Sequence, residues 1–140
     1  MRILLADRQD ITRMGLVHII QQMNVGDKEE MPGIEWKYVE DKAELMLALK
    51  DDDDAVVVLD YTLFDINDAD ELLILHQRFT HTRWLLFSED LSVDFVRVLI
   101  ASSTQFSILT KDSQLSEIKA AILYCVQGSR FICQHMTEVL

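Results

Sequence analysis

The sequence has few of the residues that interrupt regular structure, with one proline and four glycines among 140 residues. Apolar residues make up 49 % of the chain, a composition that can bury a core and that argues against disorder. The length suits a single domain. The sequence also lacks a secretory h-region and any apolar run long enough to cross a bilayer. We therefore expect one cytoplasmic domain that makes no contact with a membrane.

Basic residues are scarce as well. Lysine and arginine number 13 against 24 acidic residues, which gives a formal net charge of −11. Affinity for nucleic acid comes largely from basic side chains that neutralise phosphates, so this composition argues against direct binding of DNA or RNA. The only two cysteines, Cys125 and Cys133, belong to no CxxC motif or histidine cluster. We interpret them as reduced thiols in a reducing compartment.

Short apolar runs alternate with segments of helical periodicity along the whole chain. The predicted strands cover about residues 2–6, 35–39, 55–59, 83–87 and 107–110. The predicted helices cover about residues 11–23, 41–50, 69–79 (after Asn67 or Asp68), 92–101 and 114–128. Five strand–helix units predict an α/β domain with a doubly wound parallel sheet and helices on both faces. This domain is expected at residues 1–128, followed by a linker or short helix at 129–140.

Polar side chains stand where four of the predicted strands end. They are, in chain order, Asp7, Asp60, Ser88 and Lys111. Taken singly, such residues often do no more than begin a turn or cap a helix. The carboxyl ends of parallel strands share one edge of a sheet, however, and ligands collect there. Two acids, a hydroxyl and an amine are therefore expected to meet, and together they suit the handling of a phosphoryl group.

Four stretches carry a resemblance to a known family. They read Ile-Leu-Leu-Ala-Asp7, Arg13-Met-Gly15-Leu16, Val-Val-Val-Leu-Asp60 and Leu-Thr-Lys111-Asp112. In this order they resemble the receiver domains of two-component response regulators, in particular those of LuxR-type (NarL/FixJ-like) transcription factors. The segment that begins at Gly128 is similar to the one that leaves the receiver in that subfamily. The resemblance spans about residues 3–132 and implies a flavodoxin-like (CheY-like) five-stranded sheet of order 2-1-3-4-5.

The resemblance also implies a chemistry. Asp60 would accept a phosphoryl group from a sensor histidine kinase, while Ser88 and Lys111 would bind the phosphoryl oxygens. Asp7, Asp60 and the backbone carbonyl of Thr62 would hold Mg²⁺. Such a domain is a phosphoacceptor switch rather than a turnover enzyme. It would regulate transcription through a DNA-binding output domain that this chain does not contain, and a homodimer would suit paired half-sites.

Arg8 is the main departure from the family pattern. Most receivers have two adjacent acids after the first strand, and the second acid contacts the metal. In this chain the second position is Arg8, so Asp7 and Asp60 face two cations, Arg8 and Lys111, and the pocket is formally neutral. We expect the guanidinium to take the metal's place beside Asp60, which would leave Mg²⁺ binding weak or absent.

Three further departures lie around the same edge. Glu89 replaces a very small residue and would oppose an incoming anion. Ile108 stands where many receivers have a switch tyrosine or phenylalanine, and residues 64–68 replace the family's proline and glycine. The acids that could supply the missing metal ligand are Asp10, Asp65 and Glu89.

Two functional hypotheses follow. In the first, phosphorylation of Asp60 changes the partner affinity of the face formed by residues 92–101, 107–110 and 114–128. In the second, the chain is a pseudo-receiver, a module for protein interaction or dimerisation in which an Arg8–Asp60 pair fixes one conformation without phosphate. A hydrolase is disfavoured because Asp60-Tyr61-Thr62 lacks the second acid of the common aspartyl-phosphate hydrolases.

Overall fold

The computed structural model describes residues 2–26, 33–62, 64–66 and 68–140. Its five strands form one parallel sheet in the order β2-β1-β3-β4-β5. The strands are β1 (Arg2–Ala6), β2 (Glu35–Tyr38), β3 (Ala55–Leu59), β4 (Arg83–Ser88) and β5 (Phe106–Thr110). The predicted fold class and strand order are therefore confirmed.

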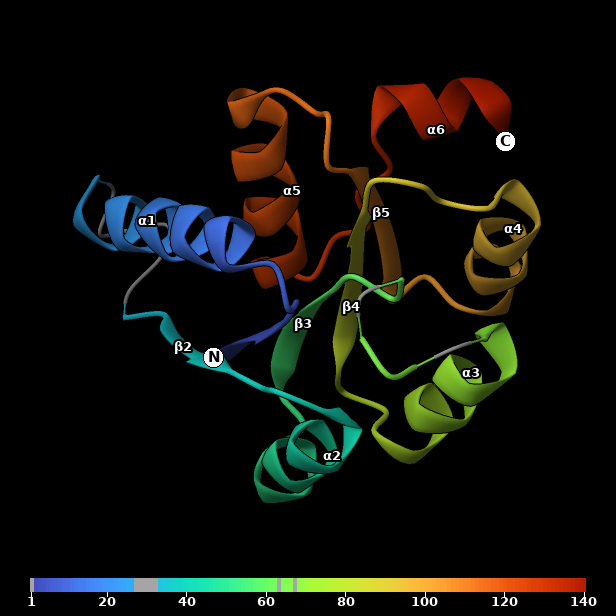
Figure 1. Ribbon diagram of the computed structural model, residues 1–140, viewed down its shortest axis with the longest axis horizontal. Helices are drawn as coiled ribbons and strands as arrows, with labels where there is room; N and C mark the ends of the chain where they lie inside the picture. The colour runs from blue at the N-terminus through green and yellow to red at the C-terminus, as the bar shows by residue number, and fades with distance from the viewer. Residues whose placement is uncertain (1, 27–32, 63, 67) are drawn as a thin grey trace.

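Helices cover both faces of this sheet (Figure 1). They are α1 (Asp10–Gly26), α2 (Lys42–Asp51), α3 (Ala69–Arg78), α4 (Val93–Ser102), α5 (Leu115–Val126) and α6 (Gln134–Val139). In Figure 1, α1 and α5 lie on one side of the strands, while α2, α3 and α4 lie on the other. This double cover buries all five residues of β3, which explains its continuous apolar run. Among the described residues, no helix combines the length and apolarity that crossing a bilayer requires.

Side-chain caps set where three of the helices begin. Asp41, Asp68 and Ser92 accept hydrogen bonds from backbone amides in the first turns of α2, α3 and α4. Of the two candidate starts of α3, Asp68 is the cap, and Asn67 lies outside the described residues. The helix α1 continues past its predicted end at residue 23. Near that end the Asn24 side chain bonds both backbone groups of Ile34, with two N–O distances of 3.0 Å.

The C-terminal segment (residues 129–140) packs against the outer edge of β5. Ile132 pairs with Ile108 as a parallel bridge, with backbone hydrogen bonds of 2.8 Å from Ile108 to Phe131 and 3.0 Å from Cys133 to Ile108. Cys133 and, in α6, Met136 are buried. Because the segment satisfies backbone groups along β5, it covers a strand edge that would otherwise be open.

Two further contacts hold this segment against its surroundings. The Arg130 guanidinium donates to the carbonyl oxygens of Ile100 and Ser103, at 3.2 and 3.3 Å, where α4 ends and its last carbonyls lack helical partners.

Cys133 and Cys125 of α5 are both free, buried thiols. Burial raises the pKa of the Cys125 thiol to about 11, so this group stays protonated at neutral pH. The proposed domain boundary at residue 128 remains a prediction.

We predict that truncating the buried side chain of α6 destabilises the whole domain. Met136→Ala should lower the free energy of unfolding by about 2 kcal/mol or more, because it leaves a cavity beneath the segment. Val139→Ala, on the exposed side of the same helix, is the matched control and should change it by less than about 0.5 kcal/mol. Urea unfolding measures both values. An unchanged midpoint for Met136→Ala would mean that the segment is only a linker.

Candidate functional site

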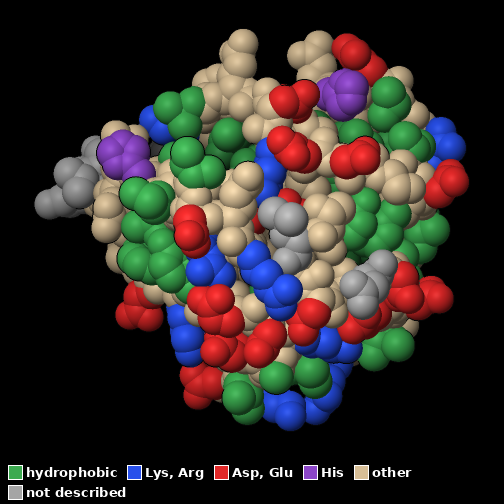
Figure 2. Space-filling model, in the orientation of Figure 1, with side chains coloured by type: hydrophobic (Ala, Val, Ile, Leu, Met, Phe, Trp, Pro, Cys, Tyr) green, Lys and Arg blue, Asp and Glu red, His purple; other side chains and the backbone are tan. Residues whose placement is uncertain are grey.

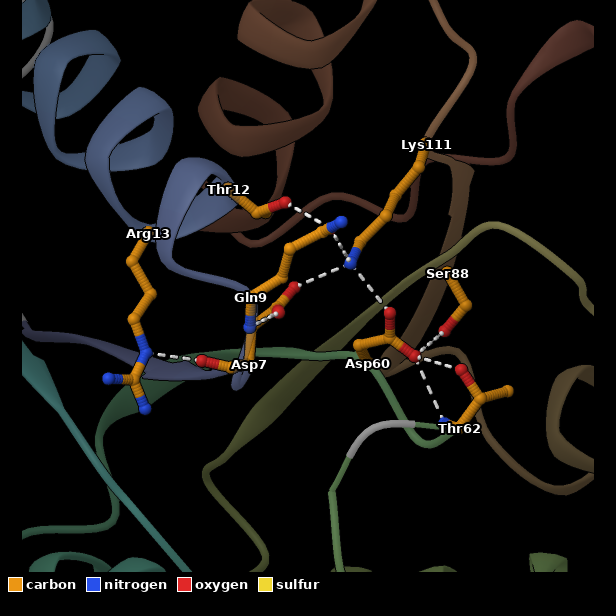
Figure 3. A network of polar contacts seen from close by, with 8 residues as sticks. All are labelled: Asp7, Gln9, Thr12, Arg13, Asp60, Thr62, Ser88 and Lys111. Carbon is orange, nitrogen blue, oxygen red and sulfur yellow. Dashed lines mark hydrogen bonds and ion pairs between the residues drawn. The ribbon is translucent and has the colours of Figure 1, made fainter.

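Four strand ends bring the predicted residues together at the carboxyl edge of the sheet (Figure 3). Asp7 directly follows β1 and Asp60 directly follows β3, two strands that are neighbours in parallel register. Ser88 is the last residue of β4, and Lys111 directly follows β5. Asp7, Asp60 and Ser88 are buried at this edge, each at most 1 % exposed. All four residues therefore share one buried cluster, which we call the acidic pocket.

The two carboxylate oxygens of Asp60 have different partners. Oδ1 accepts three hydrogen bonds, from the Thr62 amide at 3.0 Å, the Thr62 hydroxyl at 2.7 Å and the Ser88 hydroxyl at 2.8 Å. Oδ2 lies 2.7 Å from the Lys111 ammonium. The carboxylate is thus oriented by neutral donors on one oxygen and by a cation on the other.

Lys111 joins the two acids of the pocket. Its ammonium nitrogen also lies 3.0 Å from Asp7 Oδ2 and donates to Gln9 Oε1 at 2.9 Å. The contact with Asp7 Oδ2 is an ion pair without hydrogen-bond geometry. This buried oxygen therefore lies close to the positive charge of Lys111 but accepts no hydrogen bond from a described residue. The acidic pocket therefore carries two negative charges and one positive charge within a buried volume.

Opposing effects set the ionisation of Asp60. Burial of the carboxyl raises its pKa, but the hydrogen bonds from Lys111, Thr62 and Ser88 and the charge of Lys111 together hold the pKa below its ordinary value. The group is consequently an anion at neutral pH. An ionised carboxylate is the form that can act as a nucleophile.

Asp7 is positioned by residues for which the sequence suggested no role. Its Oδ1 accepts from the Gln9 amide at 2.8 Å, and its backbone oxygen accepts from Arg13 Nε. The Arg13 guanidinium is itself held by Glu40 through contacts of 3.0 and 3.1 Å and lies 5.0 Å from the Tyr38 ring. Arg13 belongs to one of the family-like stretches, which was the only signal in the sequence. No sequence motif pointed to Gln9.

Arg8 does not take the place predicted for it. Its Nε donates to the backbone oxygen of Glu40 at 3.3 Å, and its Cζ lies 5.7 Å from the centre of the Phe64 ring. Within the described part of the chain, Asp60 is ion-paired with Lys111 and not with Arg8. The predicted Arg8–Asp60 pair is therefore wrong, because Lys111 already occupies Asp60 Oδ2 and the exposed arginine turns to the rim of the pocket.

No protein-family model and no curated protein matches the sequence. Among the solved structures that match this chain are three that align over 91 to 100 % of it. The chain is similar to a LuxR-family two-component response regulator from Aurantimonas sp. SI85-9A1, with 22 % identity, a TM-score of 0.76, and coverage of 98 % of this chain and 92 % of that one. This chain has the fold of a response-regulator receiver domain.

The other two alignments agree with that fold. One is to the isolated receiver domain of RcsB from Salmonella enterica serovar Typhimurium, solved with the phosphomimetic BeF₃⁻, with 16 % identity, a TM-score of 0.75, and coverage of 100 % and 98 % of the two chains. The second is to the receiver domain of the response regulator NarL from Mycobacterium tuberculosis, with 24 % identity, a TM-score of 0.66, and coverage of 91 % and 96 %.

The residues of the acidic pocket do not fit a resident Mg²⁺. The described chain contains no group of three or more histidine, cysteine, aspartate or glutamate side chains placed to hold a metal ion. Lys111 bridges the only two carboxylates of the acidic pocket, and Arg8 occupies the sequence position of the third. Of the suggested substitutes, Asp65 accepts from the Lys42 amide at 2.8 Å, whereas Asp10 and Glu89 are exposed on the surface.

Two other departures from the receiver pattern also have a structural setting. Ile108 is fully buried, and both its backbone N–H and its carbonyl oxygen are bonded to the C-terminal segment. Glu89 lies on the rim of a groove of about 360 Å³ between α1 and α5, which Lys111 also lines. Its carboxylate therefore faces the surface beside the acidic pocket, and it makes no ion pair with another described residue.

We predict that Lys111→Met raises the pKa of Asp60. Burial would then act without the cation that opposes it, so the pKa should move above the ordinary value for aspartate. The depressed native pKa means that ionised Asp60 adds to stability above its unfolded pKa, and that this contribution is lost as pH falls through the native pKa. The substitution should remove that contribution and destabilise the fold by about 3 kcal/mol at pH 7.

A carboxyl ¹³C NMR titration and urea unfolding at several pH values measure these effects. Lys50→Met, an exposed lysine in α2, is the control and should leave both unchanged. If the Asp60 pKa were the same with and without Lys111, the ion pair would not be what keeps Asp60 charged.

Proposed function

We propose that this chain is the receiver domain of a bacterial two-component phosphorelay and that a sensor histidine kinase phosphorylates Asp60. The observation that carries the proposal is the Asp60 carboxylate, ionised at the carboxyl edge of the sheet, with the Ser88 hydroxyl at 2.8 Å and the Lys111 ammonium at 2.7 Å. A carboxylate with a hydroxyl and an ammonium beside it supplies a nucleophile and two groups that stabilise phosphoryl oxygens.

The reaction needs little beyond positioning and charge stabilisation. A carboxylate oxygen of Asp60 attacks the phosphorus of a phosphohistidine, an O–P bond forms, and the P–N bond breaks with its electron pair returning to the imidazole. The product is an acyl phosphate on Asp60. Lys111 stabilises the charge on the transferring group as a point charge, and Ser88 donates a hydrogen bond to one of its oxygens.

The receiver fold supports further partners in this proposal. Regulation of transcription would need a separate output domain, and DNA would be bound there rather than by this acidic chain. On the face shown in Figure 2, lysine and arginine side chains are scattered among more numerous acidic ones, which disfavours direct binding of nucleic acid. Two copies of this domain would suit output domains that bind paired half-sites.

A phosphorylation-independent interaction module is the second candidate. The observation that favours it is that both carboxylate oxygens of Asp60 already have partners. Oδ1 accepts three hydrogen bonds, and Oδ2 is ion-paired with Lys111. Such a carboxylate is stable as it stands. In this alternative Lys111, rather than the predicted Arg8, fixes the conformation, and the domain binds its protein partner without phosphorylation.

We predict that a small phosphodonor, phosphoramidate, phosphorylates wild-type protein at Asp60 in buffer with Mg²⁺. Intact mass spectrometry should show the mass of one added phosphoryl group, and Asp60→Asn should abolish it. Ser88→Ala should slow the reaction by about tenfold or more, because one charge-assisted hydrogen bond is lost. Ser116→Ala, an exposed serine of α5, should react like wild type. Absence of phosphoryl transfer to the wild-type protein would favour the interaction module.

A further inference from the structure

Phosphorylation changes the charge that the acidic pocket must accommodate. The pocket holds Asp7, Asp60 and one cation, Lys111, so its formal charge is one negative unit. Phosphorylation turns the Asp60 carboxylate into an acyl phosphate, which carries roughly 1.5 to 2 negative charges near neutral pH in place of one, so the net charge of the pocket becomes roughly 1.5 to 2 negative units. Because uncompensated charge in a buried site is strongly unfavourable, a phosphorylated Asp60 needs a second cation in addition to Lys111.

Arg8 stands at the rim where that cation is needed. It follows Asp7 directly in the chain, and its guanidinium lies against the ring of Phe64, whose own amide donates to the Asp60 carbonyl at 3.0 Å. The guanidinium therefore spans the loops that leave β1 and β3. These are the two loops whose first residues are the acids of the pocket.

The Arg8 side chain is also free to move inward. It is exposed, and its one hydrogen bond, from Nε to Glu40, is long at 3.3 Å. Its two terminal nitrogens have no hydrogen-bond or ion-pair partner among the described residues. These two nitrogens form the planar fork that matches the geometry of phosphate oxygens.

Arg13 cannot serve in the same way. Its Nε holds the Asp7 backbone oxygen, and both terminal nitrogens are bound to the Glu40 carboxylate. Turning it toward a phosphoryl group would break all three contacts. Of these two arginines beside Asp7, only Arg8 can reach the pocket without breaking an ion pair.

We propose that Arg8 replaces the divalent metal of this site, so that Asp60 accepts and holds a phosphoryl group without Mg²⁺. This inference rests on the proposed function. The guanidinium leaves the Phe64 ring and binds the phosphoryl oxygens from the side of β1, opposite Lys111 and Ser88. In the test reaction the Asp60 oxygen forms the O–P bond, the P–N bond of phosphoramidate breaks, and the nitrogen takes a proton from water and leaves as ammonia.

The experiment compares phosphoryl transfer from phosphoramidate in EDTA with transfer in Mg²⁺, using intact mass as the readout. Wild type should react at rates within about threefold of each other in the two buffers. Arg8→Gln should lose about tenfold or more in EDTA, the effect of removing a charge-assisted contact. Arg8→Asp restores the usual second acid and should react only with Mg²⁺.

Arg78→Gln is the matched control. Arg78 is likewise an exposed arginine, stacked on an aromatic ring with its Cζ 5.5 Å from the Phe79 ring centre, but it lies at the end of α3. It should behave like wild type in both buffers. A ¹H–¹⁵N spectrum of each variant checks folding. In wild type, the Arg8 Nε resonance should shift on phosphorylation in EDTA, while Asp60→Asn treated in the same way should show no shift.

Three results would overturn the inference. Wild type that reacts only with Mg²⁺ would overturn the role of Arg8 and leave the proposed function standing. Wild type that is inert in both buffers, with Arg8→Asp active in Mg²⁺, would make Arg8 an inhibitor of phosphorylation and favour the interaction module. No transfer to wild type or to Arg8→Asp in either buffer would reject the proposed function together with the inference.

Discussion

The ammonium of Lys111, placed between two buried carboxylates, is the contact on which the site depends. It lies 2.7 Å from Asp60 and 3.0 Å from Asp7, which come from the neighbouring strands β3 and β1, while Lys111 follows the edge strand β5. The two carboxylates are each at most 1 % exposed and repel each other, and the Lys111 ammonium offsets part of this repulsion. The sheet order brings both acids to one edge. Because β5 ends at the same edge, the sheet order also brings the lysine that offsets their charge. The parallel fold and the charge of the pocket are therefore parts of one arrangement.

The neutral hydrogen-bond donors around Asp60 have a different role from the Lys111 ammonium. Thr62 and Ser88 together direct three protons at Oδ1, which fixes the orientation of the carboxylate and leaves Oδ2 to Lys111. Burial alone would favour the protonated acid. The depressed pKa shows that the hydrogen bonds and the cation outweigh desolvation. A buried carboxylate that is kept charged, with its donors already in place, would require little reorganisation in order to act as a nucleophile.

Local sequence patterns predict which four residues meet at this edge but not which residues contact them. The ends of the apolar runs placed Asp7, Asp60, Ser88 and Lys111 correctly, because strand termini are encoded by neighbouring residues and parallel strands share an edge. The direction of Arg8 could not be read in that way. It depends on a backbone oxygen at Glu40, which is 32 positions away in sequence, and on the ring of Phe64. The bridge between Ile132 and Ile108 escaped prediction for the same reason, since an isolated pairing leaves no periodicity in the sequence.

The C-terminal segment constrains how a change at Asp60 could be transmitted. Receivers with an aromatic ring at the position of Ile108 can signal by moving that ring, but here the side chain is aliphatic and the backbone is bonded to Phe131 and Cys133. The middle of β5 is thus held from outside. The polar contacts between β5 and the acidic pocket lie at the end of the strand, where Thr110 contacts Ser113 at 3.2 Å and the Lys111 ammonium contacts three residues. A signal that begins at the acidic pocket would therefore act first on the loop between β5 and α5, and the packed segment beside it would limit how far that loop can move.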